Sequence, residues 1–283
     1  MNSSKFKFIE VPYEEGTFWR KGTKEGPRIV LDKFETMREY SIRAKKIINL
    51  DLSNICRERM NLNPYNKGES LEKIYLKALE TLEACYIPIF IGGDHSITYP
   101  IMKAYKKVFK DGELGIIQFD AHSDTFAPVE GYKFHHGATF RNIIEDKIIC
   151  APDIHQLGVR GQVRKDSYDY ALDNEVDVIS ISKLKRCNCD ISSLNINKEK
   201  FYYISLDIDA VDPAYAPGTG TPVPGGLTSY EIIDLINQLK EYKIVGMDLV
   251  EVAPIYDSSE ITSLLASHLL FELIVNDNFY SLL

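Results

Sequence analysis

Short, nearly continuous apolar runs alternate along the chain with longer amphipathic stretches. The apolar runs are rich in Ile, Val, Leu, Phe and Tyr, as expected for strands that are buried on both faces of a parallel sheet. The pattern therefore predicts strands over seven segments: Lys46–Leu50, Ile87–Ile91, Leu114–Asp120, Ile154–Val159, Val176–Ile181, Tyr202–Ile208 and Ile244–Val250.

The amphipathic stretches predict helices over Ser70–Cys85, Ser96–Phe109, Thr139–Asp146, Ser229–Tyr242 and Glu260–Val275. Ser229 is a plausible N-cap of its helix. Strands that alternate with helices are typical of an α/β protein with a parallel sheet flanked by helices. No repeat or linker divides the chain, and the Pro/Gly-rich stretch Asp212–Gly226 follows a predicted strand. We therefore expect one domain over residues 1–283.

Acidic and histidine residues follow three of the predicted strands directly. The carboxyl ends of strands are where open α/β sheets place their ligands. The first group is Gly92-Gly93-Asp94-His95-Ser96, in which two glycines allow a tight turn from strand to helix. Taken alone, His95 fits a helix-capping or core histidine about as well as a metal ligand.

The second group is Asp120, His122 and Asp124, at the end of a predicted strand. In an extended segment, residues i, i+2 and i+4 point to the same side, so three possible ligands converge. A solvated polar loop is the weaker interpretation, because the apolar run Ile116–Phe119 leads straight into Asp120. Carboxylates at the end of a buried strand are costly unless a cation lies between them.

The third group is Asp207 and Asp209, which again share a face, with Asp212 three residues later. The turn-rich segment from Asp212 to Gly226 suits a pocket wall. Asp212 itself fits structural hydrogen bonds as well as contact with a ligand.

Together the three groups offer two imidazoles and four carboxylates. Oxygen donors with some imidazole suit Mn²⁺, with Co²⁺, Ni²⁺ or Zn²⁺ less favoured. Four carboxylates balance the charge of two divalent ions, so we expect a two-metal site and hydrolysis by metal-activated water. The proposed ligands are His95, Asp120, His122, Asp124, Asp207 and Asp209.

Composition narrows the range of partners. The net charge of −8, from 33 basic and 41 acidic residues, disfavours nucleic acid as a partner. No apolar run is long enough for a transmembrane helix and no signal peptide is apparent, so we expect a cytoplasmic protein without membrane contact. Cys187 and Cys189 resemble half of a zinc site, but no second pair lies near them; reduced bystander thiols are the better interpretation.

Three long motifs resemble the ureohydrolase (arginase/agmatinase) family, in consistent order from about Ile87 to the C-terminus. The resemblance implies a three-layer α/β/α sandwich around a mostly parallel sheet, with a dinuclear manganese centre. It also implies a homo-oligomer, either a trimer or a hexamer. The motifs are Gly92–Ser96, Phe119–Asp124, and Ser205–Pro213 with its continuation Pro217–Gly226.

The family pattern also implies roles for individual residues. One ion would bind His95, Asp120, Asp124 and Asp207, and the other Asp120, His122, Asp207 and Asp209. Asp124 would also orient the nucleophile, His136 would shuttle a proton to the departing amine, and Glu251 would pair with the substrate guanidinium. Without the resemblance, the sequence does not show whether His135 or His136 is the functional histidine. Glu251 would then be interpreted as an ordinary glutamate at the end of a strand.

The segments around Asp124 and His136 look like those of agmatinases, which implies agmatine as substrate and putrescine and urea as products. Arginases carry an Asn shortly after this Asp to bind the amino acid head group, whereas this chain has Phe126. Because Phe126 has no hydrogen-bond donor, the α-carboxylate of a bound arginine would lack a partner, which disfavours arginine as a substrate. His135 replaces an acidic residue that often precedes the His-Gly pair in agmatinases.

Other functions fit parts of the same pattern. A guanidinobutyrase, another guanidino acid hydrolase or a formimidoylglutamase would need a basic residue at the pocket rim, for which Arg160 and Lys133 are candidates. An arginase is a further alternative within the family. A non-catalytic binding protein would not need all six ligands, and a two-metal phosphoesterase fits the acidic pocket poorly. A small cationic guanidine is therefore the expected partner.

Overall fold

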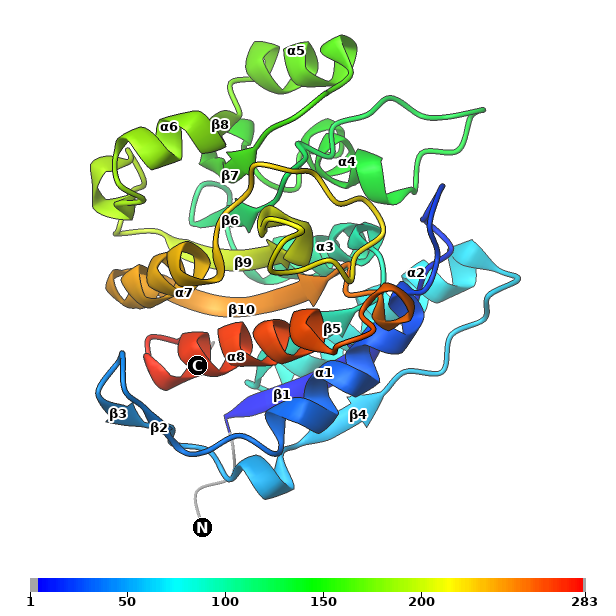
Figure 1. The fold of residues 1–283 in the computed structure, drawn as a ribbon. Coiled ribbons are helices and arrows are strands. Elements are labelled where there is room, and N and C mark those ends of the chain that lie inside the picture. Colours follow the sequence, from blue (N-terminus) through cyan, green and yellow to red (C-terminus); the bar gives the residue numbers. More distant parts are fainter. Residues whose placement is uncertain (1–4, 282–283) are drawn as a thin grey trace.

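The computed structural model describes residues 5–281 and contains a central sheet of eight strands, all parallel (Figure 1). Their order across the sheet is β4-β1-β5-β10-β9-β6-β7-β8. The strands are β1 (Phe6–Val11), β4 (Arg57–Arg59), β5 (Ile87–Gly92), β6 (Leu114–Phe119), β7 (Ile154–Val159), β8 (Asp177–Ser180), β9 (Phe201–Asp207) and β10 (Lys243–Val250).

Helices cover both faces of the sheet, which gives the three-layer α/β/α arrangement that the sequence predicts (Figure 1). One hydrophobic core contains residues of α1 (Gly26–Phe34), α6 (Ile181–Arg186), α7 (Ser229–Gln238) and α8 (Ile261–Val275). The core on the opposite face contains residues of α2 (Lys67–Glu83), α3 (Thr98–Val108), α4 (Thr139–Glu145) and α5 (Lys165–Asp173). In residues 5–281, no helix is long and apolar enough to span a bilayer.

The central strands explain the continuous apolar runs. Every residue of β5 is buried, and its side chains alternate between the two cores: Ile89 and Ile91 belong to one core and Phe90 to the other. A strand that contacts helices on both sides has no polar face, so its sequence shows no alternation. The predicted strands from Ile87 onward are confirmed, with ends that differ by one or two residues.

Two local predictions are wrong. The segment Lys46–Leu50 does not join the central sheet; only β3 (Lys46–Ile47) is extended, and it pairs antiparallel with β2 (Tyr40–Ser41) in a separate hairpin. The helix α7 is capped by Thr228 rather than Ser229. The Thr228 hydroxyl accepts a hydrogen bond from the backbone of Glu231, whose carboxylate accepts one from the backbone of Thr228, which completes a capping box.

The strands β1 and β4 were not predicted from the apolar pattern because charged residues interrupt them. Glu10 in β1 is buried, and its two carboxylate oxygens accept hydrogen bonds from Arg57 at 2.6 Å and Arg59 at 2.8 Å, both in β4. The ion pairs satisfy a carboxylate that otherwise argues against a buried strand. The helices α1, α5 and α6 were also missed.

Because all eight strands are parallel, their carboxyl ends lie at one edge of the sheet. The four adjacent strands β5, β10, β9 and β6 occupy its middle. The three polar groups of the sequence follow β5, β6 and β9, and Glu251 follows β10. The topology therefore gathers segments that are far apart in the sequence at one place.

Candidate metal centre and active site

The loop after β5 positions His95 by local hydrogen bonds. Asp94 caps the short helix η3 (His95–Ile97), because its carboxylate accepts a hydrogen bond from the backbone of Ser96 at 2.9 Å. The same carboxylate accepts a hydrogen bond from the backbone of Gly16 at 2.7 Å. A Cβ at Gly93 would stand 1.6 Å from the carbonyl oxygen of Tyr13, so this turn requires glycine. As a result, His95 is completely buried.

The loop after β6 brings Asp120, His122 and Asp124 to the same edge. Asp120 is fully buried, and its Oδ2 accepts a hydrogen bond from Gln118 at 2.6 Å. Asp124 has a φ of 48°, in the left-handed region that non-glycine residues seldom adopt. Backbone strain of this kind persists where the surroundings require a particular side-chain placement. At Asp124, the strained backbone places the carboxylate toward His95.

The end of β9 supplies the remaining carboxylates. Asp207 caps the short helix η7 (Ile208–Ala210) and accepts a hydrogen bond from the backbone of Asp209 at 2.8 Å. Asp209 accepts hydrogen bonds from the backbone of Ala121 at 3.0 Å and from the hydroxyl of Thr221 at 3.1 Å. These contacts connect the loops after β6 and β9 directly.

The structure brings all six predicted ligands together. His95 Nδ1 lies 3.1 Å from Asp120 Oδ2, 3.1 Å from Asp124 Oδ2 and 3.3 Å from Asp207 Oδ2. His122 Nδ1 lies 3.0 Å from Asp209 Oδ2 and 3.4 Å from Asp120 Oδ1. Each histidine thus faces its own set of carboxylates, and Asp120 belongs to both sets through its two oxygens. Two neighbouring groups able to hold a metal ion result.

The tautomer that His95 adopts when its ring is neutral follows from the hydrogen bond of its second ring nitrogen. Ser205 Oγ donates its only proton to Asp248 at 2.8 Å, so at 2.9 Å it accepts a hydrogen bond from His95 Nε2. Nδ1 of the neutral ring then carries a lone pair. That nitrogen is buried without a hydrogen-bond partner, although three carboxylate oxygens surround it. A lone pair that faces three carboxylates is stable only with a cation between them.

The carboxylates also change the affinity of the histidines for protons. Burial alone lowers the pKa of His95, but the carboxylates of Asp120, Asp124 and Asp207 around Nδ1 raise it well above its ordinary value. The pKa of His122 is raised in the same way, through Asp209 and Asp120. Burial and the neighbouring Asp209 and Asp120 raise the pKa of Asp207 well above its usual range. The cluster therefore takes up positive charge, and the donor set fits divalent metal ions.

Glu251 follows β10 and lies beside the cluster. Its φ of 63° is again in the left-handed region. One carboxylate oxygen accepts a hydrogen bond from the backbone of His95 at 2.9 Å and lies 3.1 Å from His136 Nδ1. The other oxygen, Oε2, is buried and has no hydrogen-bond partner within the described chain. Glu251 is thus available to a cationic group.

His136 and His135 have different surroundings. Burial lowers the pKa of His136, but the hydrogen bond and charge of Glu251 outweigh it and raise the pKa to about 9. The ring of His135 instead packs against Phe18, with ring centroids 4.4 Å apart, and burial lowers its pKa to about 4. At neutral pH His136 is therefore charged and His135 is neutral. The structure places His136 beside Glu251 and His135 against Phe18.

Other residues singled out in the sequence have structural partners. Arg160 is buried, and its guanidinium donates to the carbonyl oxygens of Gly158, Asp209, Ala210, Val211 and Val223. The ammonium of Lys133 lies over the ring of Phe134 and 3.8 Å from Asp146. Asp212 accepts hydrogen bonds from the backbone of Ala214, Gly225 and Gly226, so it holds the loop. Arg160 is thus not free to bind a substrate carboxylate.

The cysteines of the described chain are unpaired. Cys187 and Cys189 belong to no group of residues able to hold a metal in residues 5–281. The thiol of Cys187 instead donates to the carbonyl oxygen of Leu184 at 3.0 Å. These contacts agree with the interpretation of these cysteines as bystanders.

Sequence reasoning missed the residues that hold the ligands in place. Asp248 is buried in β10 and accepts hydrogen bonds from Thr98 at 2.7 Å, Tyr203 at 3.0 Å and Ser205 at 2.8 Å. An aspartate within an otherwise apolar strand was the available signal, since such a carboxylate needs partners. Gln118, within the apolar β6, gave a similar signal.

The fold and the site define a three-layer α/β protein with a buried histidine and aspartate cluster, able to hold metal, at the carboxyl edge of its sheet. Residues 4–275 match the family described as the Arginase family. The chain belongs to this family and is a hydrolase that acts on guanidino C–N bonds.

Individual relatives agree with this assignment. The chain is 36% identical to mitochondrial agmatinase of Gallus gallus over 278 residues, which covers 94% of this chain and 79% of the relative. It is 36% identical to mitochondrial guanidino acid hydrolase of Homo sapiens over 281 residues, or 94% and 76% of the two chains. The solved structure of proclavaminate amidino hydrolase from Streptomyces clavuligerus matches with a TM-score of 0.86 and 33% identity, and the match covers 96% of this chain and 91% of that one.

Proposed function

We propose that the protein hydrolyses a linear guanidino compound to urea and an amine with two bound Mn²⁺ ions, and that agmatine is its principal substrate. The observation that carries the proposal is the pair of metal-binding groups that share Asp120, next to a buried Glu251 whose Oε2 has no partner in the described chain. A dinuclear cluster would supply the nucleophile, and the oxygen Oε2 of Glu251 beside it, unpartnered in residues 5–281, would bind the guanidinium.

The ligand assignments follow the family pattern. One ion would be held by His95, Asp120, Asp124 and Asp207, and the other by Asp120, His122, Asp207 and Asp209. When bound, the two ions would lower the pKa of a water molecule, which supplies a nucleophile at neutral pH. Ser205 and Asp248 would hold the ring of His95 in the tautomer that binds metal.

The residues of the chain account for the other steps. Oε2 of Glu251 would accept charge-assisted hydrogen bonds from the guanidinium and so orient its carbon toward the cluster. His136, which is protonated at neutral pH because its pKa is about 9, would donate a proton to the nitrogen of the departing amine as the C–N bond breaks. Asp124, held close to His95, would orient the nucleophile. The products are urea and the amine.

Two observations support agmatine over substrates that carry a carboxylate. Phe126 occupies the position of the arginase Asn, and its ring offers no hydrogen bond to an amino acid head group. Arg160 and Lys133 already have partners. A guanidino acid is the second candidate, because the Arg20 guanidinium lies against Tyr256 and makes no ion pair in the described chain. Relatives named as agmatinase and as guanidino acid hydrolase are equally similar.

We also propose, from the family resemblance, that residues 1–283 form a single ureohydrolase domain and that the chain assembles into a trimer or hexamer. Light scattering on a size-exclusion column tests the assembly. If agmatine is the substrate, the product putrescine gives the protein a role in polyamine biosynthesis, for which we propose a cytoplasmic location.

A urea-release assay with manganese tests the proposal, with agmatine, arginine, 4-guanidinobutyrate and formimidoylglutamate as substrates. We expect the highest kcat/KM for agmatine. The variant Glu251→Gln keeps the proposed metal ligands, so it should retain metal and lose activity on every guanidine. Activity on arginine or guanidinobutyrate but not agmatine would overturn the substrate. No urea from any guanidine by the manganese-loaded protein would overturn the function itself.

A further inference from the structure

Phe18 is a large apolar side chain at the edge of the proposed site. Its side chain is 52% exposed, although one face of the ring packs against His135. Its ring centroid also lies 6.0 Å from that of His136, whose Nδ1 is 3.1 Å from the Glu251 carboxylate. The exposed part of the ring is therefore close to the place where a guanidinium would bind.

The segment that carries Phe18 is fixed at this position. The carbonyl oxygen of Gly16 accepts a hydrogen bond from the backbone of His136 at 3.1 Å, and the backbone of Gly16 donates to Asp94 at 2.7 Å. At the other end of the segment, the guanidinium of Arg20 lies 3.8 Å from the centre of the Tyr256 ring. Contacts on both sides of Phe18 leave its main chain little freedom.

The same segment borders the free oxygen of Glu251. A Cβ at Gly220 would stand 2.9 Å from the carbonyl oxygen of Arg20 and 3.8 Å from Glu251 Oε2. The main-chain carbonyl of Arg20 and Glu251 Oε2 thus both lie within 4 Å of one point beside Gly220. This places the segment that carries Phe18 near Oε2.

We propose that Phe18 packs against the aliphatic chain of the guanidino substrate and makes the enzyme select for linear guanidines with several methylene groups. The inference rests on the proposed function. Six bonds join the guanidino carbon of agmatine to its distal nitrogen, a reach of roughly 7 Å in a staggered chain. A chain of this length, held at Glu251 beside His136, would reach the ring of Phe18, whose centroid lies 6.0 Å from that of His136. Burial of methylene groups on an aromatic ring strengthens binding in proportion to the apolar area removed from water.

Phe18 has a second way to affect activity, because its ring also contacts the two histidines. If it only positioned His136, its removal would slow proton donation for every substrate, whatever the chain length. If it contacts the substrate chain, its removal affects long guanidines and leaves methylguanidine unchanged. The dependence on chain length therefore separates the two roles.

The test measures kcat and KM for urea release from methyl-, ethyl-, propyl- and butylguanidine. The proteins are the wild type, Phe18→Ala, Phe18→Leu and the control Tyr65→Ala, which removes a ring that is 97% exposed. We expect Phe18→Ala to lose roughly tenfold in kcat/KM for butylguanidine, mainly through KM, because it loses contacts with several methylene groups. Methylguanidine should be hydrolysed at the wild-type rate. Phe18→Leu should lie between, and Tyr65→Ala should match the wild type.

The manganese-loaded proteins are used throughout, so that the split between KM and kcat separates binding of the chain from turnover. Phe18→Ala should raise KM for butylguanidine alone. Equal losses for both guanidines, or no loss for butylguanidine, would overturn the role of Phe18 while wild-type urea release upholds the proposed function. If Phe18→Ala does not fold, Phe18→Leu decides by the same comparison. If the wild type releases no urea from any guanidine, both the role of Phe18 and the proposed function are overturned.

Discussion

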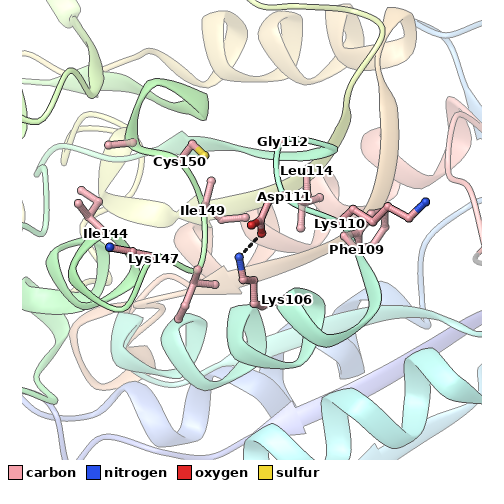
Figure 2. Close-up of a pocket in the computed structure, with 12 residues that line it drawn as sticks. Lys106, Phe109, Lys110, Asp111, Gly112, Leu114, Ile144, Lys147, Ile149 and Cys150 are labelled. Atoms are coloured by element: carbon pink, nitrogen blue, oxygen red, sulfur yellow. Dashed lines mark hydrogen bonds and ion pairs between the residues drawn. The ribbon is translucent and has the colours of Figure 1, made fainter.

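The two edges of the central sheet differ in where their charged groups lie. At the carboxyl edge, the histidine and aspartate cluster follows β5, β6 and β9. At the opposite edge, a cavity of about 300 Å³ lies beside the start of β6, between the C-terminal ends of α3 and α4 (Figure 2). Its walls are mostly apolar, with lysines at the rim, namely Lys106, Lys110 and Lys147.

The exposure of the charged side chains distinguishes the two edges. In the cavity of Figure 2, Lys106 pairs with Asp111, and their side chains are 37% and 81% exposed. At the carboxyl edge, the side chains of Asp120 and His95 are completely buried. Exposed charges keep their water and need no ligand, whereas buried like charges require a compensating cation. The comparison shows that the buried charges that require a cation lie at the carboxyl edge and not in the cavity of Figure 2.

The substitution Asp207→Asn gives the largest expected effect on this contrast. Asp207 lies 3.3 Å from His95 and would bridge both ions, so loss of its charge should abolish metal occupancy at one or both positions and with it urea release. Elemental analysis of the purified variant measures the metal directly. Full manganese content in Asp207→Asn would refute the bridging role.

Ser205→Ala tests whether the hydrogen bond between His95 Nε2 and Ser205 fixes the tautomer of His95 that binds metal. The substitution removes the acceptor of the His95 Nε2 proton and leaves the six proposed ligands in place. Manganese affinity should fall by roughly 10- to 100-fold, the usual cost of losing a partner of a metal-binding histidine. Competition with a metal indicator measures the affinity. An affinity within twofold of the wild type would show that Ser205 does not orient the ring.

His136 should make the stability of the metal-free protein depend on pH. Folding raises its pKa from the ordinary 6.5 to about 9, because Glu251 stabilises the charged ring. Its stabilising contribution, about 3 kcal/mol at most, is therefore complete below pH 6.5 and is lost as the pH rises through about 9. Denaturant unfolding of chelator-treated wild type and His136→Gln measures the difference between them. A difference that does not shrink between pH 6.5 and 9 contradicts the assignment.

Lys106→Ala should have the smallest effect. It removes the exposed pair with Asp111 at the opposite edge, so the free energy of unfolding should change by no more than about 1 kcal/mol. Metal content and urea release should equal those of the wild type. A tenfold loss of activity in this variant would show that the cavity of Figure 2 is coupled to the site, and the contrast between the edges would fail.

Much of the fold, and the meeting of the six proposed ligands at one place, could be predicted from the sequence because the central strands are buried on both faces. The apolar runs before Asp120 and Asp207 marked both the strands and the place where polar residues had to meet. By contrast, β1 was missed because Glu10 is paired with arginines of β4, a contact between residues 47 and 49 positions apart. Local patterns contain no information about such partners.

The candidate site was predictable only in part for the same reason. The spacing of Asp120, His122 and Asp124 indicated convergence, but Glu251 looked like an ordinary residue at the end of a strand. Its position beside His95 depends on the pairing of β10 with β5, which brings residues 156 positions apart into contact. The choice between His135 and His136 likewise depended on the packing of Phe18, which no periodicity reveals.

The most direct test of the account is the number of metal ions per chain in the active wild-type protein. Elemental analysis after loading with manganese and removal of excess metal gives this number, and urea release from agmatine confirms that the same sample is active. Two ions per chain are expected, because three buried aspartates and two histidines form two groups that share Asp120, and a fourth carboxylate, that of Asp124, lies 3.1 Å from His95. One ion per chain, or full activity with no metal, would contradict the dinuclear site.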